Sequence, residues 1–261
     1  MEQFWVFLIV LLFICVTYGF GALYFIVCDK NRKFILKTGG WKWFCLNSAI
    51  GVPFHEISHL IFAVIFRHRI TGVALFRPFK GRQDGNLGYV RHSYNRSSLW
   101  QTLGNFFIGV APMLFGSAVL LVILLTCYPE CFNIQTSFES EIDNWTNAGQ
   151  SFDRLLLMFE PDSFFRLPML LLIVFAVFVC PHLGMSKADF KGVLTGTMSL
   201  LGAGWIIPFY LTSWKNWLTY DQIISGLTVF MIYYFYALLI GFVISALVML
   251  FNFVLSRLHS V

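Results

Sequence analysis

Residues 55–59 contain three side chains that together can bind a metal ion and use it for hydrolysis. The segment reads His55-Glu56-Ile57-Ser58-His59. Residues i and i+4 of a helix lie on one face, so His55 and His59 can hold one Zn²⁺ through their imidazole nitrogens. Glu56 lies beside them and can accept a proton from metal-bound water. Zinc lowers the pKa of such water to about 7, and the resulting hydroxide can attack an amide carbonyl.

The surroundings of this motif strengthen the functional interpretation. It lies within an apolar segment, residues 41–66, where ionisable groups are costly and usually serve a function. The alternative interpretation is a buried polar cluster that bonds to neighbouring helices. A catalytic zinc also needs a third protein ligand and an open position. Asp189 is the favoured candidate and His182 the rival, although a carboxylate at the start of a helix can simply complement the helix dipole.

Other polar residues are weaker candidates for the functional site. Asn105 can donate to a developing oxyanion or contact substrate, or it can make a helix–helix hydrogen bond. His68 and His92 belong to a basic segment and are expected to be solvated. Three glycines of the same apolar run as Asn105 predict close packing between helices: Gly104, Gly109 and Gly116.

The composition is that of a helical membrane protein. The chain of 261 residues is 58% hydrophobic and 12% charged, and its mean hydropathy is +0.73. Soluble domains are about 25% charged. The net charge of +5 is attributed to cytoplasmic loops, which collect Lys and Arg. No basic and aromatic array of the kind that binds nucleic acid is present in the sequence.

The apolar runs predict a single membrane domain, residues 1–261, with about six transmembrane helices in an all-α polytopic fold. A span needs about 20 residues, so five or seven spans are alternatives. The runs cover residues 4–27, 41–66, 99–126, 166–181, 190–213 and 226–256.

Charges in the loops predict the orientation. Segment 67–98 is rich in Arg and should be cytoplasmic, whereas segment 127–165 is acidic and is expected outside. Both termini are then cytoplasmic. Segment 28–40 conflicts with this scheme, because it is basic yet falls outside. Cys127 and Cys131 flank a turn that is expected outside, at the start of the acidic segment, and are either bridged or free.

Segment 67–98 also contains two β-prone runs around a Gly-, Asp- and Asn-containing turn. This pattern predicts a small hairpin or sheet directly after the motif helix.

At this level the chain resembles the site-2 protease group of intramembrane zinc metalloproteases, in particular the short bacterial forms without a PDZ domain. The resemblance covers roughly residues 41–200. It rests on Phe54-His55-Glu56-Ile57-Ser58-His59, on the β-prone loop with Gly88-Tyr89-Val90, on the Gly- and Pro-containing span from Leu103 to Gly116, and on Ser186-x-x-Asp189.

The resemblance implies one zinc ion held by two His and a later Asp, at a site within the membrane towards the cytoplasm. It also implies a bacterial inner membrane location and a role in regulated intramembrane proteolysis. The substrates would be transmembrane segments of other membrane proteins. An extended substrate could add to the edge of the sheet at Gly88, Tyr89 and Val90 by main-chain hydrogen bonds.

Two other functions compete with proteolysis. One is a zinc-binding scaffold or regulator without protease activity, but metal binding alone does not need Glu56. The other is a transporter, which would favour repeated halves with broken helices, and the sequence contains no such repeat.

Overall fold

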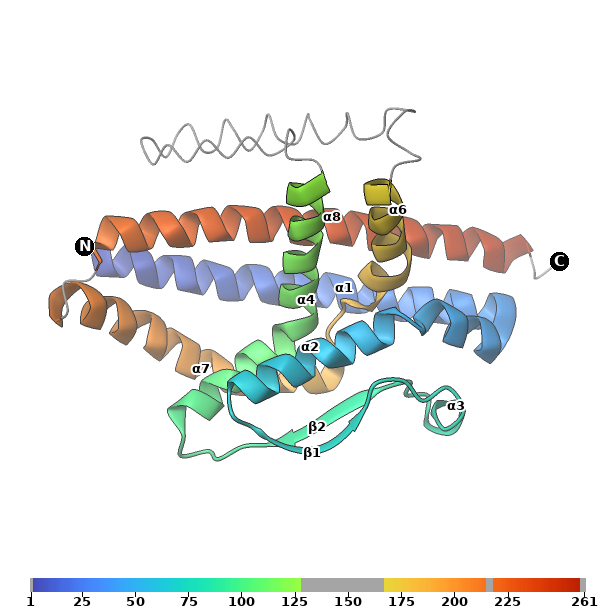
Figure 1. The fold of residues 1–261 in the computed structure, drawn as a ribbon, viewed down its shortest axis with the longest axis horizontal. Coiled ribbons are helices and arrows are strands. Elements are labelled where there is room, and N and C mark those ends of the chain that lie inside the picture. Colours follow the sequence, from blue (N-terminus) through green and yellow to red (C-terminus); the bar gives the residue numbers. More distant parts are fainter. Residues whose placement is uncertain (1, 128–166, 215–217, 259–261) are drawn as a thin grey trace.

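The computed structural model describes residues 2–127, 167–214 and 218–258, and these are mostly helical (Figure 1). Helix α1 (Glu2–Ser48) is followed by α2 (Gly51–Ile65), a strand β1 (Arg69–Ala74), the short α3 (Gly81–Asp84), a strand β2 (Tyr89–Ser93) and α4 (Leu99–Cys127). After the gap come α6 (Leu167–Val174), a π-helical turn η4 (Phe175–Val179) and a 3-10 turn η5 (Cys180–His182). The chain ends with α7 (Lys187–Phe209), η6 (Tyr210–Trp214) and α8 (Tyr220–Leu258).

The two longest helices, α1 and α8, lie side by side and run in the same direction (Figure 1). Thr17 bonds to Tyr234 at 3.3 Å between their hydroxyl oxygens, and Asn252 donates to the Asn31 side chain at 2.9 Å. Both pairs are buried. Because the pair nearer the start of α1 is also nearer the start of α8, the order of the contacts confirms the parallel arrangement.

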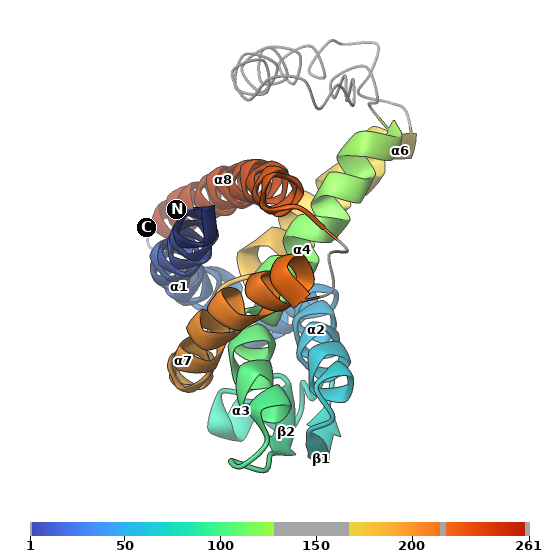
Figure 2. The same cartoon turned by 90° about the vertical axis from the view of Figure 1, so that its left-hand side faces the viewer.

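The remaining helices lie against this pair. Helix α7 packs on α4 and α1, while α4 and α6 run across the pair rather than along it (Figures 1 and 2). The main apolar core lies where these elements meet, and it includes Tyr24, Phe106, Leu183 and Val193. The motif helix α2 packs on α4, so the core holds the helices that surround the motif.

The described helices fit a membrane protein. Four of them, Glu2–Ser48, Leu99–Leu125, Lys187–Ser213 and Tyr220–Leu258, are long and apolar enough to cross a membrane. Gly51–Ile65 and Leu170–His182 are apolar but shorter. Large apolar side chains stand exposed on several of the long helices, for example Leu12, Val122, Met198 and Leu247. Such a surface suits lipid rather than water. Six spans in total stay a prediction.

Segment 28–40 differs from the expected loop, because α1 continues through it. Its charges are compatible with a helix, since Lys33 pairs with Asp29 one turn earlier at 2.6 Å. The helix is interrupted only at Gly40, whose φ of 64° lies in the left-handed region that glycine tolerates. The acidic segment and its Cys pair fall almost entirely on residues 128–166, outside the described residues.

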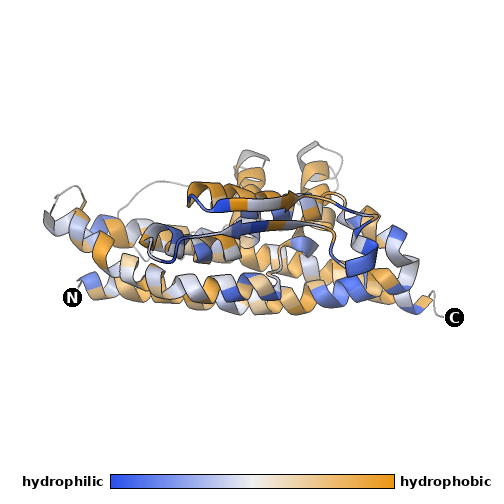
Figure 3. Cartoon of the chain, turned by 90° about the horizontal axis from the view of Figure 1, so that it is seen from below, coloured by the Kyte–Doolittle hydropathy of each residue, from blue (hydrophilic) through white to orange (hydrophobic). Residues whose placement is uncertain are grey.

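The predicted hairpin is confirmed as a two-stranded antiparallel sheet, in which Val73 pairs with Val90. A register shift between Ile70 and Gly72 marks a bulge in β1. Seen from below, the hairpin and its connecting loop contain many hydrophilic residues, whereas the long helices are largely hydrophobic (Figure 3). In its connecting loop, the Asp84 carboxylate accepts hydrogen bonds from the Asn86 amide and from Arg77, and these contacts lower the pKa of Asp84.

Close packing between α4 and α7 depends on Gly109, as the sequence led us to expect. A Cβ at Gly109 would lie 2.4 Å from Val193 Cγ2 and 2.7 Å from the Asp189 carbonyl oxygen. The second contact is with backbone, which cannot turn aside as a side chain can. Gly109 therefore allows the start of α7, with Asp189, to approach α4.

We expect Gly109→Ala to destabilise the protein by about 1–3 kcal/mol, the usual cost of overpacking. Gly202→Ala is the matched control, because a Cβ there meets no atom within 4 Å. Thermal unfolding in detergent, followed by tryptophan fluorescence, measures both. Equal melting temperatures for the two variants would contradict the packing role of Gly109.

Candidate metal centre

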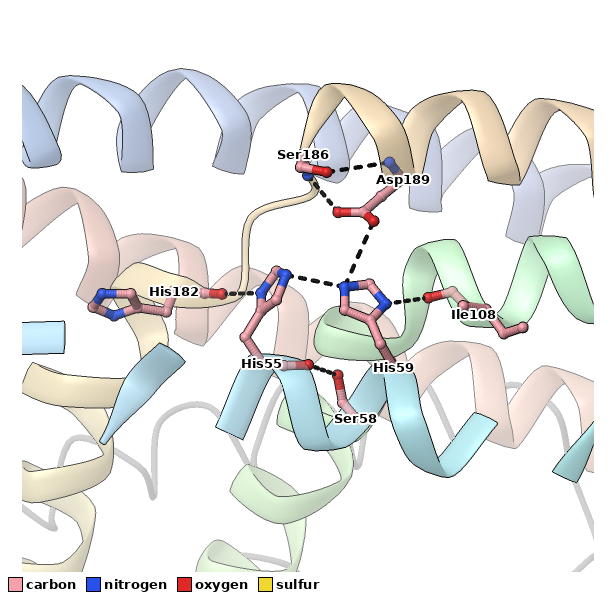
Figure 4. A network of polar contacts seen from close by, with 7 residues as sticks. All are labelled: His55, Ser58, His59, Ile108, His182, Ser186 and Asp189. Carbon is pink, nitrogen blue, oxygen red and sulfur yellow. Dashed lines mark hydrogen bonds and ion pairs between the residues drawn. The ribbon is translucent and has the colours of Figure 1, made fainter. Parts of the chain in front are cut away.

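The two motif histidines face each other from consecutive turns of α2. Their Nε2 atoms lie 3.0 Å apart (Figure 4). The His55 Nδ1 contacts the backbone carbonyl oxygen of His182 at 2.7 Å, and the His59 Nδ1 contacts that of Ile108 at 2.7 Å. A carbonyl oxygen can only accept, so each Nδ1 carries the proton.

This tautomer, assigned from the hydrogen-bond partners, leaves a lone pair on each Nε2. Two lone pairs facing each other at 3.0 Å repel one another unless a cation lies between or beside them. Histidine ligands of metals commonly donate their other ring N–H to a carbonyl or carboxylate in this way. The imidazoles are therefore oriented as metal ligands.

Asp189 comes from the first turn of α7, where its carboxylate has two different partners. Its Oδ2 accepts from the Ser186 amide at 2.6 Å, and the Ser186 hydroxyl accepts from the Asp189 amide at 3.2 Å. This reciprocal capping box begins the helix. The other oxygen, Oδ1, lies 3.6 Å from His59 Nε2 (Figure 4). Capping thus fixes the carboxylate and directs its second oxygen towards the histidines.

Ligand atoms of His55, His59 and Asp189 all lie within 4.8 Å of one another, so the three residues can hold a metal ion. Two imidazoles and one carboxylate are a usual donor set for catalytic zinc, which keeps a fourth position open. The donor chemistry and the lone-pair directions both fit zinc.

His182, the alternative candidate for the third ligand, makes other contacts. Its ring contacts the Phe178 carbonyl at 3.0 Å through Nδ1 and the Ser48 hydroxyl at 3.1 Å through Nε2. Both ring nitrogens are therefore engaged by groups other than the His55–His59–Asp189 set. Its backbone carbonyl orients His55 instead, a contribution that does not depend on the type of side chain.

Glu56 is 8% exposed and lines a cavity of about 430 Å³ together with the three candidate ligands. The backbone amide of Val90 lies near its carboxylate. Gly88 lies close by, since a Cβ there would be 2.7 Å from the Glu56 Cγ. Gly88, just before β2, and Val90 on β2 therefore lie close to the Glu56 side chain. The cavity extends to α1, where Phe25 and Arg32 also line it.

Asn105 lies on α4 and is 4% exposed. Its side-chain Nδ2 has no hydrogen-bond partner among the described residues. The residue is not among those that line the cavity, whereas Ile108, one turn further along α4, is. Asn105 is therefore not part of the cavity lining, and its contact with a substrate stays a prediction.

His68 and His92 were expected to be solvated, and this expectation is wrong for His68, which is 5% exposed. The two rings contact each other through their Nδ1 atoms at 2.9 Å. His92 also lines the cavity of the candidate metal centre. The β-prone pattern around His92 predicted a strand, but no local signal predicted its pairing with a residue at the end of the motif helix.

No family model, curated protein or solved structure matches this chain.

We expect the purified protein to hold about one zinc ion per chain, and Asp189→Ala to lose most of it because a three-ligand site becomes a two-ligand site. His182→Ala is the control, since it keeps the backbone carbonyl that orients His55. Metal analysis by mass spectrometry after dialysis measures both. Zinc retained in Asp189→Ala and lost in His182→Ala would reverse the ligand assignment.

Proposed function

We propose that the protein is an intramembrane zinc endopeptidase that hydrolyses peptide bonds in or near transmembrane segments of other membrane proteins. The observation that carries this proposal is the convergence of two imidazole lone pairs and a carboxylate oxygen within 4.8 Å of one another. A further carboxylate, Glu56, borders the same cavity. Three metal ligands with a separate acid–base group are the minimum set for zinc-assisted hydrolysis.

The chemistry divides between the metal and the protein. When bound, zinc supplies a Lewis acid that acidifies water and polarises the peptide carbonyl. Glu56 accepts one proton from the attacking water, whose oxygen forms a bond to the carbonyl carbon. The C–N bond then breaks, and Glu56 returns the proton to the leaving amine. The products are a carboxylic acid and an amine, and no oxidant or other co-reactant is needed.

The position of Glu56 favours hydrolysis over a scaffold that only binds zinc. Glu56 is not one of the three converging ligands, so a binding site alone has no use for it. Its burial would be costly without a role, because a buried carboxylate loses its hydration. The nearby Val90 amide offsets part of that cost.

A membrane-embedded substrate fits the surroundings of the site. The candidate ligands come from α2, an apolar helix, and from α7, one of the four helices long enough to cross a membrane. Apolar side chains exposed on α7, such as Leu194 and Ile206, suit contact with lipid or with an apolar helix of another protein. We place the site on the cytoplasmic side of a bacterial inner membrane, in line with the basic hairpin segment.

We further propose that the substrate adds to the sheet at Gly88, Tyr89 and Val90. Since Gly88 and Val90 both lie close to Glu56, this stretch of the chain runs beside the acid–base group. An extended peptide along this stretch would bring its backbone close to the acid–base group. β-Strand addition binds such peptides mainly through their main chain.

Glu56→Gln should abolish cleavage while leaving zinc bound, because the amide keeps the shape of the side chain but cannot accept the proton. The measurement pairs zinc analysis with cleavage of membrane-protein candidates co-expressed with the enzyme, followed by electrophoresis. Continued cleavage by Glu56→Gln would defeat this mechanism.

Gly88→Ala should reduce cleavage about tenfold or more, because the new Cβ must displace either Glu56 or the substrate-binding strand, and displacements of about 1 Å can have such effects. Gly72→Ala on β1 is the matched control, since its Cβ would meet only the Tyr89 ring, at an ordinary 3.5 Å. The measurement compares the cleavage rates of the two variants at equal zinc content. Unchanged cleavage by Gly88→Ala would contradict a role of Gly88, Tyr89 and Val90 in substrate binding.

A further inference from the structure

A chain of hydrogen bonds fixes the ring of His92 at the edge of the cavity. It begins at the backbone carbonyl of Gln101, which contacts His68 Nε2 at 2.8 Å. A carbonyl only accepts, so His68 Nε2 carries the proton and its Nδ1 holds a lone pair. His92 Nδ1 lies 2.9 Å from His68 Nδ1, so it must donate to that lone pair. The remaining nitrogen, His92 Nε2, is therefore an acceptor.

The anchor of this chain is rigid. The His68 amide donates to the Ala63 carbonyl at 2.8 Å, and so closes the end of α2. Gln101 holds the same corner from α4, because its side-chain Nε2 donates to the Arg67 carbonyl at 3.0 Å. The Tyr94 ring stacks on His68, with the ring centroids 5.4 Å apart. The helix that carries the candidate ligands thus also fixes His68.

His92 lies on the face of β2 that borders the site. Successive side chains of a strand alternate between faces, so His92 shares a face with Val90 and not with Arg91. Val90 and His92 both line the cavity, as does Tyr89 at the start of the strand, whereas Arg91 does not. Glu56 and His92 line the same cavity as the candidate metal ligands.

The uncharged state of His92 agrees with this arrangement. Burial, followed by the charge of His68, lowers the pKa of His92 to about 4. Burial likewise lowers the pKa of His68. A neutral ring has one acceptor nitrogen, and His92 is half-buried at the cavity, so a ligand that fills the cavity must offer this nitrogen a donor. Most of the donors that an extended peptide offers are its backbone N–H groups.

We propose that His92 is a substrate-binding residue whose Nε2 accepts a hydrogen bond from one backbone N–H of the bound peptide, and that His68 is the positioning residue that keeps this nitrogen an acceptor. The inference rests on the proposed function and adds a rule of specificity to it. At one position near the cut, the substrate must have a backbone N–H, so proline is excluded there.

Amide-to-ester replacement tests this directly, because an ester lacks the N–H but adds no bulk. The probes are leucine tetrapeptides capped with a hydroxamate, which chelates zinc, with each backbone amide replaced in turn by an ester. Their affinities for the zinc-loaded full-length protein in detergent are measured by calorimetry. One replacement should weaken binding to the wild type about tenfold, and the same replacement should cost less than about twofold in His92→Phe.

Variants of His68 separate positioning from general structural support. His68→Phe should lose the sensitivity to that ester, as His92→Phe does, because nothing then fixes the tautomer. His68→Gln should keep the wild-type sensitivity to the ester, since a glutamine side chain can donate to the Gln101 carbonyl and accept from His92. Ser93→Ala, on the opposite face of β2, is the control that should keep the wild-type pattern.

The outcomes separate this inference from the proposed function. Equal ester penalties in wild type and His92→Phe at every position, with zinc and the parent hydroxamate still bound, would overturn the role of His92 and leave the metal centre intact. A wild-type protein that binds neither zinc nor the parent hydroxamate would overturn both.

Discussion

The arrangement of the site depends on two short hydrogen bonds from imidazole N–H groups to backbone carbonyls. The acceptor for His55 belongs to η5, and the acceptor for His59 belongs to α4. Each bond sets both the tautomer and the plane of a ring, so the lone pairs converge before any ion arrives. A site preorganised in this way loses little conformational entropy when it binds metal. The packing of α2 against α4 and η5 therefore sets the orientation of the two histidine ligands.

Close backbone approach is the second requirement, and glycine meets it at two places. Gly109 brings the start of α7 against α4, and with it the carboxylate of Asp189. Gly88 brings β2 against Glu56. In both cases a side chain would occupy the space that a functional group needs. The third ligand and the acid–base group are therefore positioned by residues that themselves carry no chemistry.

Local patterns in the sequence predicted the features that depend on local geometry. The spacing of His55 and His59 follows from the helical repeat, and the two β-prone runs predicted the hairpin. Asp189 was favoured over His182 as the third ligand, although its place at the start of a helix also suited a simple dipole complement, and the structure brings its carboxylate to the histidines. The carbonyls of Ile108 and His182 could not be predicted, because every residue has one. The His68–His92 pair joins a helix end to a strand across the hairpin, and no periodicity encodes it. The basic residues of segment 28–40 suggested a loop, yet an ion pair within one turn and the buried pairing of Asn31 with Asn252 suit a continuous helix.

The parallel pairing of α1 with α8 has a consequence for the order of assembly. These two helices stand at opposite ends of the chain, and buried partners such as Tyr24 and the Leu238 carbonyl are separated by almost the whole sequence. During synthesis α1 cannot pair with α8 until α8 has been made, and contacts between such distant segments form slowly. The elements around the candidate metal centre are all made earlier. We therefore expect the centre to take shape while one side of α1 is still uncovered, and the last helix to complete the core around it.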